Sequence, residues 1–350
     1  MKGAGAMSMG IWSPKGPLVL LLALVLGGCD NLVLPEEIGD GPVENFDFVW
    51  KEVDRHYSLF QVKDVEWDSA YADFRPLVDS GTSSGTLFSV LAGMLDRLQD
   101  GHVRLESGSR VHRYNGWYEP YRHNFDWQYV WHRRILARGI TASDRIRFGW
   151  MNQSIAYIYI PTFQGEGWAG EIDDALERLS GMQGLIVDVR DNTGGSDSNA
   201  EKIASRFARE RTLYRRIQYR NGPEHDDFSP MEDDYLEPRG DMSFHGPMAV
   251  LTNRRTFSAA ESFVLAMRTV PGVVTVGDTT GGGSGNPIHR EMPNGWTFTV
   301  SRWIEWAPDG TTHEGTGLAP DIPAFIPEEQ LGSVDPILSA AIRHLLGEIS

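Results

Sequence analysis

The chain has 350 residues, of which 41% are hydrophobic and 23% are charged, as expected for a globular protein with an apolar core. Its 32 basic and 48 acidic side chains give a net charge of −16, which disfavours a nucleic-acid partner because such proteins need a basic surface. This length fits one large domain or two modest ones.

The first residues resemble a bacterial secretion signal. Lys2 and Lys15 precede the apolar run LVLLLALVL (18–26), which is too short to span a bilayer but has the length of a signal-peptide core. The run ends in LGGCDN, where small residues immediately before Cys29 resemble the lipobox of bacterial lipoproteins. A generic signal peptide or a buried N-terminal helix is the alternative. Cys29 is the only cysteine, which leaves no disulfide within one chain and no cysteine-based metal site or thiol catalyst elsewhere.

The chain before residue 151 is predicted to comprise four segments. A lipoprotein signal peptide covers 1–28, and an acidic linker containing Pro and Gly covers 29–42. A small helical subdomain covers 43–105, because apolar residues recur there at helical spacing. The two helical stripes are Phe46, Val49, Trp50, Val53 and Tyr57, then Leu87, Leu91, Leu95 and Leu98. Residues 106–150 form an aromatic-rich connecting segment without clear periodicity.

Residues 151–345 carry apolar strands that alternate with amphipathic helices. The expected strands are SIAYIYIP, GLIVDVR, PMAVLT, GVVTVGD and GWTFTVSRWIEW, and the expected helices are IDDALERLSGM, NAEKIASRFA and SAAESFVLAMRTV. This order predicts an α/β core with a largely parallel sheet. The acidic stretch 222–241 is predicted to be a solvated surface loop rather than a metal site.

Three loops of this core follow buried strands and are rich in Gly or Ser. They are DNTGG (191–195), NRRTFSAAES (253–262) and TTGGGSGNP (279–287). In α/β folds the loops at the carboxyl ends of parallel strands carry the functional site, and glycine lets the backbone approach a ligand closely. We therefore expect chemistry in these loops.

Ser258 opens the helix after a buried strand, and two interpretations of this serine are open. A serine at such a position is commonly a helix N-cap, and position alone favours that role. It could instead attack a carbonyl group, with a neighbouring backbone N–H stabilising the oxyanion at the start of the helix.

A serine nucleophile needs a base. The last lysine in the chain is Lys202, so a dyad with a lysine downstream of Ser258 is excluded. Histidine is the other option. His102 is distinctive among the ten histidines because it follows a predicted helix end in LQDGHVRL. Its alternative role is that of a helix-terminal histidine interacting with the helix dipole.

Five segments in order resemble the C-terminal processing peptidase and tricorn core family of serine peptidases. They are LDRLQDGHVRL, GLIVDVRDNTGG, VLTNRRTFSAAES, VVTVGDTTGGGSG and DGTTHEGTGLAPDI. The resemblance implies a ClpP/crotonase-like β-α spiral core preceded by a small N-terminal helical subdomain. Many members carry a PDZ domain after the D-x-H segment, but only about 45 residues fill that gap here, which is too few for such a module.

The resemblance implies roles for individual residues. Ser258 becomes the nucleophile, and the N–H of Ala259 together with that of Gly194 or Gly195 would form the oxyanion hole. The family's lysine branch carries its base in the loop that here is TTGGGSG, without a lysine. The chain is therefore similar to the tricorn-like branch, whose base is a histidine at the position of His102.

That branch orients its histidine through a neighbouring serine and a distant glutamate. The glutamate corresponds to Glu314 in this chain. The serine position holds Gly101, so water or another hydroxyl group would have to complete the relay.

The implied function is that of a serine peptidase acting on peptide or protein substrates, with no cofactor, no metal and no nucleic-acid partner. Membrane contact is expected only through a lipid anchor at Cys29, which would place the protein in the bacterial cell envelope, on its periplasmic or extracytoplasmic face. Two alternatives are a non-catalytic ligand- or peptide-binding protein on the same fold and a crotonase-like acyl-CoA enzyme. The latter would need an adenine and phosphate site, for which the Gly-rich loops show no basic cluster.

Overall fold

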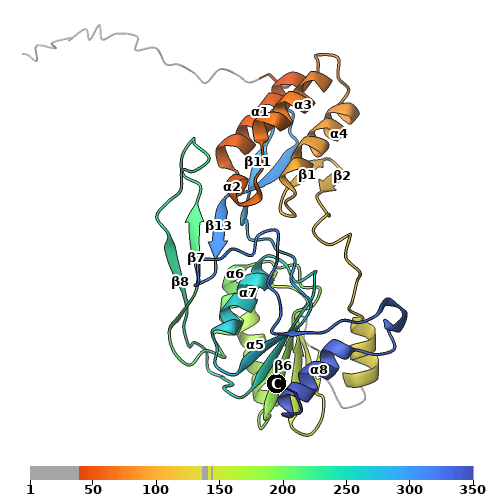
Figure 1. The fold of residues 1–350 in the computed structure, drawn as a ribbon, viewed down its shortest axis with the longest axis vertical. Coiled ribbons are helices and arrows are strands. Elements are labelled where there is room, and N and C mark those ends of the chain that lie inside the picture. Colours follow the sequence, from red (N-terminus) through yellow and green to blue (C-terminus); the bar gives the residue numbers. More distant parts are fainter. Residues whose placement is uncertain (1–38, 136–140, 143–144, 350) are drawn as a thin grey trace, which may run out of the picture. The chain divides into compact units, whose positions relative to one another are not determined.

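The structure, a computed structural model, describes residues 39–135, 141–142 and 145–349 (Figure 1). The expected signal peptide at 1–28, the lipidation site at Cys29 and most of the linker at 29–42 lie outside the described residues. Within the described ranges, no helix combines the length and the apolar character that crossing a bilayer requires.

The N-terminal part begins with helices that bury the apolar stripes seen in the sequence. They are α1 (Pro42–His56), α2 (Phe60–Lys63), α3 (Trp67–Phe74) and α4 (Ser84–Leu95). Phe46, Val49 and Val53 of α1 are fully buried, which confirms the predicted stripe. Ser83 caps α4 by accepting the backbone N–H of Thr86.

A four-stranded sheet packs with these helices and draws its strands from both ends of the chain. Its order is β11 (Pro287–Glu291), β12 (Thr297–Ser301), β1 (Arg104–Ser107) and β2 (Arg110–Arg113), and neighbouring strands are antiparallel. Leu91 of α4 and Phe298 of β12 lie in the same buried cluster. The N-terminal helices therefore share a core with strands encoded about 200 residues later.

The main sheet has seven strands and contains the expected parallel core. Its order is β14 (Ile322–Pro323), β10 (Val273–Gly277), β9 (Met248–Thr252), β6 (Gly184–Asp188), β5 (Ile155–Tyr159), β4 (Arg147–Trp150) and β3 (Thr141–Ala142). Strands β14, β10, β9, β6 and β5 run parallel, and β4 and β3 extend the sheet antiparallel. Residues 106–150 thus end in the last two strands on one side of this sheet, with β3 at the edge.

Helices cover both faces of the main sheet, which explains the nearly continuous apolar strands. Helices α5 (Trp168–Arg178), α6 (Asp197–Ala204) and α7 (Ala259–Arg268) contribute to one buried cluster, and α8 (Pro336–Leu345) contributes to another. Successive residues of β6 alternate between the clusters: Leu185 and Val187 belong to the first and Ile186 to the second. The α/β fold class predicted from the sequence is confirmed.

A third sheet corrects two expectations. It consists of β13 (Trp303–Trp306), β7 (Thr212–Tyr219) and β8 (Glu232–Leu236). The segment GWTFTVSRWIEW is therefore two strands in two sheets, β12 and β13, rather than one strand. The stretch 222–241 is not simply a solvated loop, because β8 lies within it.

Ion pairs hold this acidic strand against β7. Arg215 pairs with Asp234 at 2.9 Å, and Arg216 pairs with Asp233 at 2.8 Å. The acidic residues of β8 thus find partners in arginines that sequence analysis had not connected with them. Short helical turns at Arg75–Leu77, Asp96–Leu98, Tyr129–Ile135 and Glu328–Gln330 complete the described elements.

Candidate active site

Ser258 lies in the tight turn between β9 and α7, at the carboxyl edge of the main sheet. Its backbone has φ 60° and ψ −129°, a conformation that is rare for a residue with a side chain. Such strain costs about 1–3 kcal/mol and typically occurs where it aims a functional side chain. A sharp strand-to-helix turn is also how serine hydrolases of α/β type expose their nucleophile.

The side chain of Ser258 contacts His102, which lies 156 residues earlier in the chain. The Ser258 Oγ and the His102 Nε2 are 2.9 Å apart, within hydrogen-bond distance. His102 follows the helical turn after α4, and its carbonyl accepts a hydrogen bond from the Thr299 hydroxyl of β12. The imidazole also packs on the ring of Phe257, with a centroid distance of 4.7 Å. The structure thus brings together the two residues to which the resemblance assigned nucleophile and base.

Asp100 lies on the other side of the imidazole and was not singled out by sequence analysis. Its Oδ1 accepts the backbone N–H of His102 at 2.8 Å and lies 3.5 Å from the His102 Nδ1. Its Oδ2 accepts the Ser301 hydroxyl at 2.6 Å. Burial alone would raise the pKa of Asp100, but the facing His102 and the nearby Lys63 outweigh it and hold that pKa below its usual range. The carboxylate is therefore ionised.

The acidic surroundings of His102 affect its titration. Burial alone would lower its pKa, but Asp100 first, and then Glu314 and Glu261, favour the charged imidazolium and raise it above 6.5. The side chain is only 8% exposed. An imidazole in this setting can accept a proton from Ser258 and hold it close to a negative charge.

The backbone donors near Ser258 differ in availability. The N–H of Gly194 donates to the Asn192 Oδ1 at 2.9 Å. Within the described residues, the N–H groups of Ala259 and Gly195 donate no hydrogen bond. Gly194 is required for another reason, because a Cβ there would lie 2.8 Å from both the Phe257 oxygen and the Ser258 Cβ. Gly194 and Gly195 share one loop, and Gly194 packs against the turn that carries Ser258. Of the three residues predicted for the oxyanion hole, Ala259 and Gly195 therefore have a free N–H donor within the described residues.

Buried ionic contacts fix the loop that carries these glycines. Arg190 donates to Asp188 through Nε and Nη2 and pairs with Asp335 at the start of α8 at 2.9 Å. The side-chain amide of Asn192 donates to the carbonyl oxygen of Ile160 at 3.0 Å. The D-x-R-x-N pattern before the two glycines thus has a structural explanation, which the sequence alone did not supply.

Glu261, in the first turn of α7, ties the serine turn to the loop TTGGGSG. Its carboxylate accepts the N–H of Ser258 at 3.1 Å, the N–H groups of Gly282 and Gly283 at 2.7 and 2.8 Å, and the Thr280 hydroxyl. Burial raises the pKa of this carboxyl group. Ser258 occupies the N-cap position of α7 while its hydroxyl contacts His102, so the N-cap position is compatible with the contact to the predicted base.

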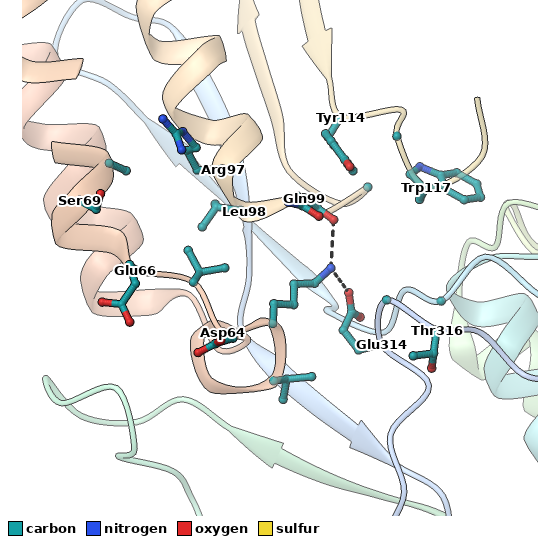
Figure 2. Close-up of a pocket in the computed structure, with 18 of the residues that line it drawn as sticks. Asp64, Glu66, Ser69, Arg97, Leu98, Gln99, Tyr114, Trp117, Glu314 and Thr316 are labelled. Atoms are coloured by element: carbon teal, nitrogen blue, oxygen red, sulfur yellow. Dashed lines mark hydrogen bonds and ion pairs between the residues drawn. The ribbon is translucent and has the colours of Figure 1, made fainter. Parts of the chain in front are cut away.

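Glu314 lies in the same region but contacts other residues. Its Oε1 pairs with the Lys63 Nζ of α2 at 2.8 Å, and its Oε2 accepts the N–H of Ser284 at 2.7 Å. Lys63 also donates to the carbonyl oxygen of Gln99 at 3.0 Å, and Figure 2 shows both contacts of its ammonium group. Among the described contacts, no hydrogen bond or ion pair joins Glu314 to His102.

Two cavities adjoin at the site. Ser258 and His102 line a cavity of about 440 Å³ together with Arg255, Thr193 and His289. A second cavity of about 620 Å³ is lined by residues of α2, α3 and the Glu314 loop (Figure 2). Gly101 and Trp117 line both cavities, so Trp117 of the aromatic connecting segment forms part of the shared wall. In the part of the chain that the structure describes, no group of three His, Cys, Asp or Glu side chains is arranged to hold a metal ion.

This fold and the serine–histidine contact are those of a serine hydrolase, and comparison with known proteins specifies the family. The family model for Peptidase family S41 matches residues 154–324, and that for the Tricorn protease C1 domain matches residues 42–96. A crystal structure of a putative peptidase from Parabacteroides merdae has 36% sequence identity and a TM-score of 0.81, and the match covers 89% of this chain and all of that one. The chain belongs to peptidase family S41.

Curated relatives carry the same part of the fold within longer chains. The chain is 28% identical over 181 residues to the carboxy-terminal processing protease CtpA of Bacillus subtilis, a match covering 51% of this chain and 36% of the relative. It is 29% identical over 199 residues to the tricorn protease of Thermoplasma acidophilum, covering 56% of this chain and 17% of the relative. The chain thus matches about a third or less of the length of these relatives.

Proposed function

We propose that this protein is a serine peptidase that cleaves peptide bonds through an acyl-enzyme on Ser258. The observation that carries the proposal is the 2.9 Å contact between the Ser258 Oγ and the His102 Nε2 at the wall of an open cavity. The strained turn holds the hydroxyl at the start of α7, where the helix dipole favours developing negative charge.

The reaction follows from the proton positions. The Ser258 Oγ attacks the carbonyl carbon of the scissile bond while the His102 Nε2 takes the hydroxyl proton, and the same nitrogen then gives that proton to the leaving amine. The N–H of Ala259, with a glycine N–H of the 191–195 loop, stabilises the oxyanion. Water then attacks the ester carbonyl while the His102 Nε2 accepts one of its protons. The bond between the acyl carbon and the Ser258 Oγ breaks, His102 returns the proton to that oxygen, and the carboxylic acid product leaves.

Peptides or proteins are the proposed substrates. Two named relatives are a carboxy-terminal processing protease and a tricorn protease, and membership of a peptidase family favours the same class here. A non-catalytic binding protein would not need a serine in strained geometry against a histidine. A crotonase-like acyl-CoA enzyme is disfavoured by the family match.

Substitution of the nucleophile tests the proposal directly. Ser258→Ala should reduce hydrolysis of a peptide library to background while the far-ultraviolet circular dichroism and the melting temperature stay close to wild type. Ser198→Ala is the matched control, because Ser198 is an exposed serine on α6, away from the contact with His102. Equal turnover by Ser258→Ala and wild type would refute the proposed function.

A lipid anchor at Cys29 is the proposed means of attachment to the bacterial cell envelope. The support is the sequence LGGCDN after a nine-residue apolar run, with Cys29 as the only cysteine. In a bacterial host, wild type should incorporate radiolabelled palmitate and sediment with membranes, whereas Cys29→Ser should do neither. Labelling of the Cys29→Ser variant would refute the anchor and leave the peptidase proposal unaffected.

A further inference from the structure

Three buried carboxylates lie near His102, those of Asp100, Glu261 and Glu314, and only that of Asp100 faces its second ring nitrogen. The Glu261 carboxylate accepts the N–H groups of Ser258, Gly282 and Gly283 instead. The Oδ1 of Asp100 is 3.5 Å from the Nδ1, and the Asp100 side chain is completely buried. Within the described residues the Nδ1 has no hydrogen-bond partner, so the ring nitrogen that a charge-orienting residue would engage is otherwise unoccupied. Such contacts are often long in the substrate-free state and shorten when substrate binds.

Asp100 is itself held firmly enough to position the imidazole. Its two oxygens accept from different chain segments: Oδ1 from the backbone of His102 and Oδ2 from Ser301 of β12. Thr299, two residues earlier on β12, binds the carbonyl oxygen of His102. One strand therefore supports both the histidine and the carboxylate beside it, as a preorganised site requires.

Glu314 has other partners. Both of its oxygens are engaged, by Lys63 on one side and by the N–H and hydroxyl groups of Ser284 on the other. Its side chain is 1% exposed, and Lys63 neutralises its charge directly. In Figure 2 a dashed line joins Glu314 to the ammonium group of Lys63 at the wall of the second cavity. The pair links helix α2 to the loop after β13.

The space beside His102 leaves no room for a relay serine. A Cβ at Gly101 would lie 2.5 Å from the Trp117 Nε1 and 2.9 Å from the Phe257 Cζ. Trp117 stacks on Phe257 at 4.1 Å between ring centroids, and Phe257 contacts His102 in turn. A Cβ at Gly281, on the facing loop, would also lie 2.6 Å from Phe257. Aromatic rings and glycines therefore fill the position at which a serine would connect the histidine to a distant glutamate.

We infer that Asp100 is the positioning residue for His102 and that the Lys63–Glu314 pair serves as a structural tie instead. This inference rests on the proposed peptidase function for its consequence, but the arrangement itself can be measured without turnover. The two roles predict effects of different size for the isosteric substitutions, a large one for Asp100→Asn and a small one for Glu314→Gln.

A histidine titration followed by NMR separates the two carboxylates. The Ser258→Ala protein with ¹³Cε1-labelled histidine serves as the reference, and His102→Gln identifies the signal. In that background Asp100→Asn should lower the pKa of His102 by about one unit or more, and Glu314→Gln by less than about half a unit. An equal or larger fall with Glu314→Gln, or no fall with Asp100→Asn, overturns the inference. Because no turnover is involved, failure of the proposed peptidase function would not produce either result.

Kinetics supply the second readout. If the protein hydrolyses peptides, Asp100→Asn should lower kcat by about 10²- to 10⁴-fold with little change in KM, and Glu314→Gln should lower it by less than about tenfold. If Asp100→Asn does not fold, Ser301→Ala, which keeps the carboxylate but removes one of its hydrogen bonds, carries the test. It should change both kcat and the pKa of His102, and wild-type values for both would overturn the inference.

Discussion

The regions around Asp100 and Glu314 both contain a buried carboxylate near His102, yet their partners differ. Asp100 receives hydrogen bonds from a backbone N–H and from Ser301 and faces an imidazole, whereas Glu314 faces the ammonium group of Lys63. The Asp100 carboxylate raises the pKa of the imidazole that it faces, whereas the charge of Glu314 is balanced by the ammonium group of Lys63. Proximity and acidity alone therefore do not identify the residue that orients a base. The groups that each carboxylate contacts determine whether it can orient the base.

The largest effect should come from the base itself. His102→Ala should lower kcat for peptide hydrolysis by about 10²- to 10⁴-fold, because within the described residues His102 is the side chain that contacts the Ser258 hydroxyl and can accept its proton. The double variant Ser258→Ala/His102→Ala should be no slower than Ser258→Ala, since the two groups act as a unit. Additive losses in steady-state assays would show that the residues act independently.

Breaking the ion pair of the second region should affect stability first. Lys63→Met leaves the Glu314 carboxylate buried and unpaired, which should cost about 3–5 kcal/mol in the free energy of unfolding. Chemical denaturation measures this loss. The double variant Lys63→Met/Glu314→Gln should recover much of it, because no charge is then stranded. A Lys63→Met protein of wild-type stability would contradict the structural role assigned to the pair.

The pH dependence of activity should report the first region. The base must be neutral, and the neighbouring carboxylates raise the pKa of His102 above 6.5, so kcat/KM should fall with an acid-side midpoint above that value. A group whose pKa is raised on folding stabilises the protein below its unfolded pKa, and this contribution is lost as pH rises through the folded pKa. The stability difference between wild type and Asp100→Asn should accordingly be larger at pH 6 than at pH 9. An acid-side midpoint below 6.5 would count against this arrangement.

The smallest effect is expected far from both carboxylates. Ser83→Ala removes the cap of α4 and should lower the free energy of unfolding by about 1 kcal/mol with kcat unchanged. Ser83→Asp, which retains an acceptor at the cap, is the matched control. A change in kcat would show that the stability of α4 affects the position of His102, which the observed contacts do not predict.

Local pattern predicted the parallel core well. The alternation of apolar strands and amphipathic helices gave β5, β6, β9 and β10 with bounds close to those observed, because each strand is buried on both faces. Ser258 and His102 could also be selected from the sequence, because the motifs that contain them occur in the order that is typical of the family. These features can be predicted because they depend on hydrophobic periodicity and turn residues within short stretches of sequence.

Long-range partnerships could not be predicted in this way. Nothing in the sequence around Ser301 shows that it contacts Asp100. The contact depends on the pairing of β12 with β1 in the four-stranded sheet rather than with strands of the main sheet. The pairing of Lys63 with Glu314 likewise joins residues far apart in the sequence. The glutamate was matched by position in a motif, and its neighbours, which determine its role, come from another part of the chain.

Mapping of a fluorophosphonate adduct by mass spectrometry tests the central claim most directly. The account predicts one adduct in wild type, on the peptide that contains Ser258, and a labelling rate about 10²-fold or more lower in His102→Ala at neutral pH. An adduct on a different residue, or a rate that does not change when His102 is removed, would contradict the assignment of Ser258 as a nucleophile activated by His102.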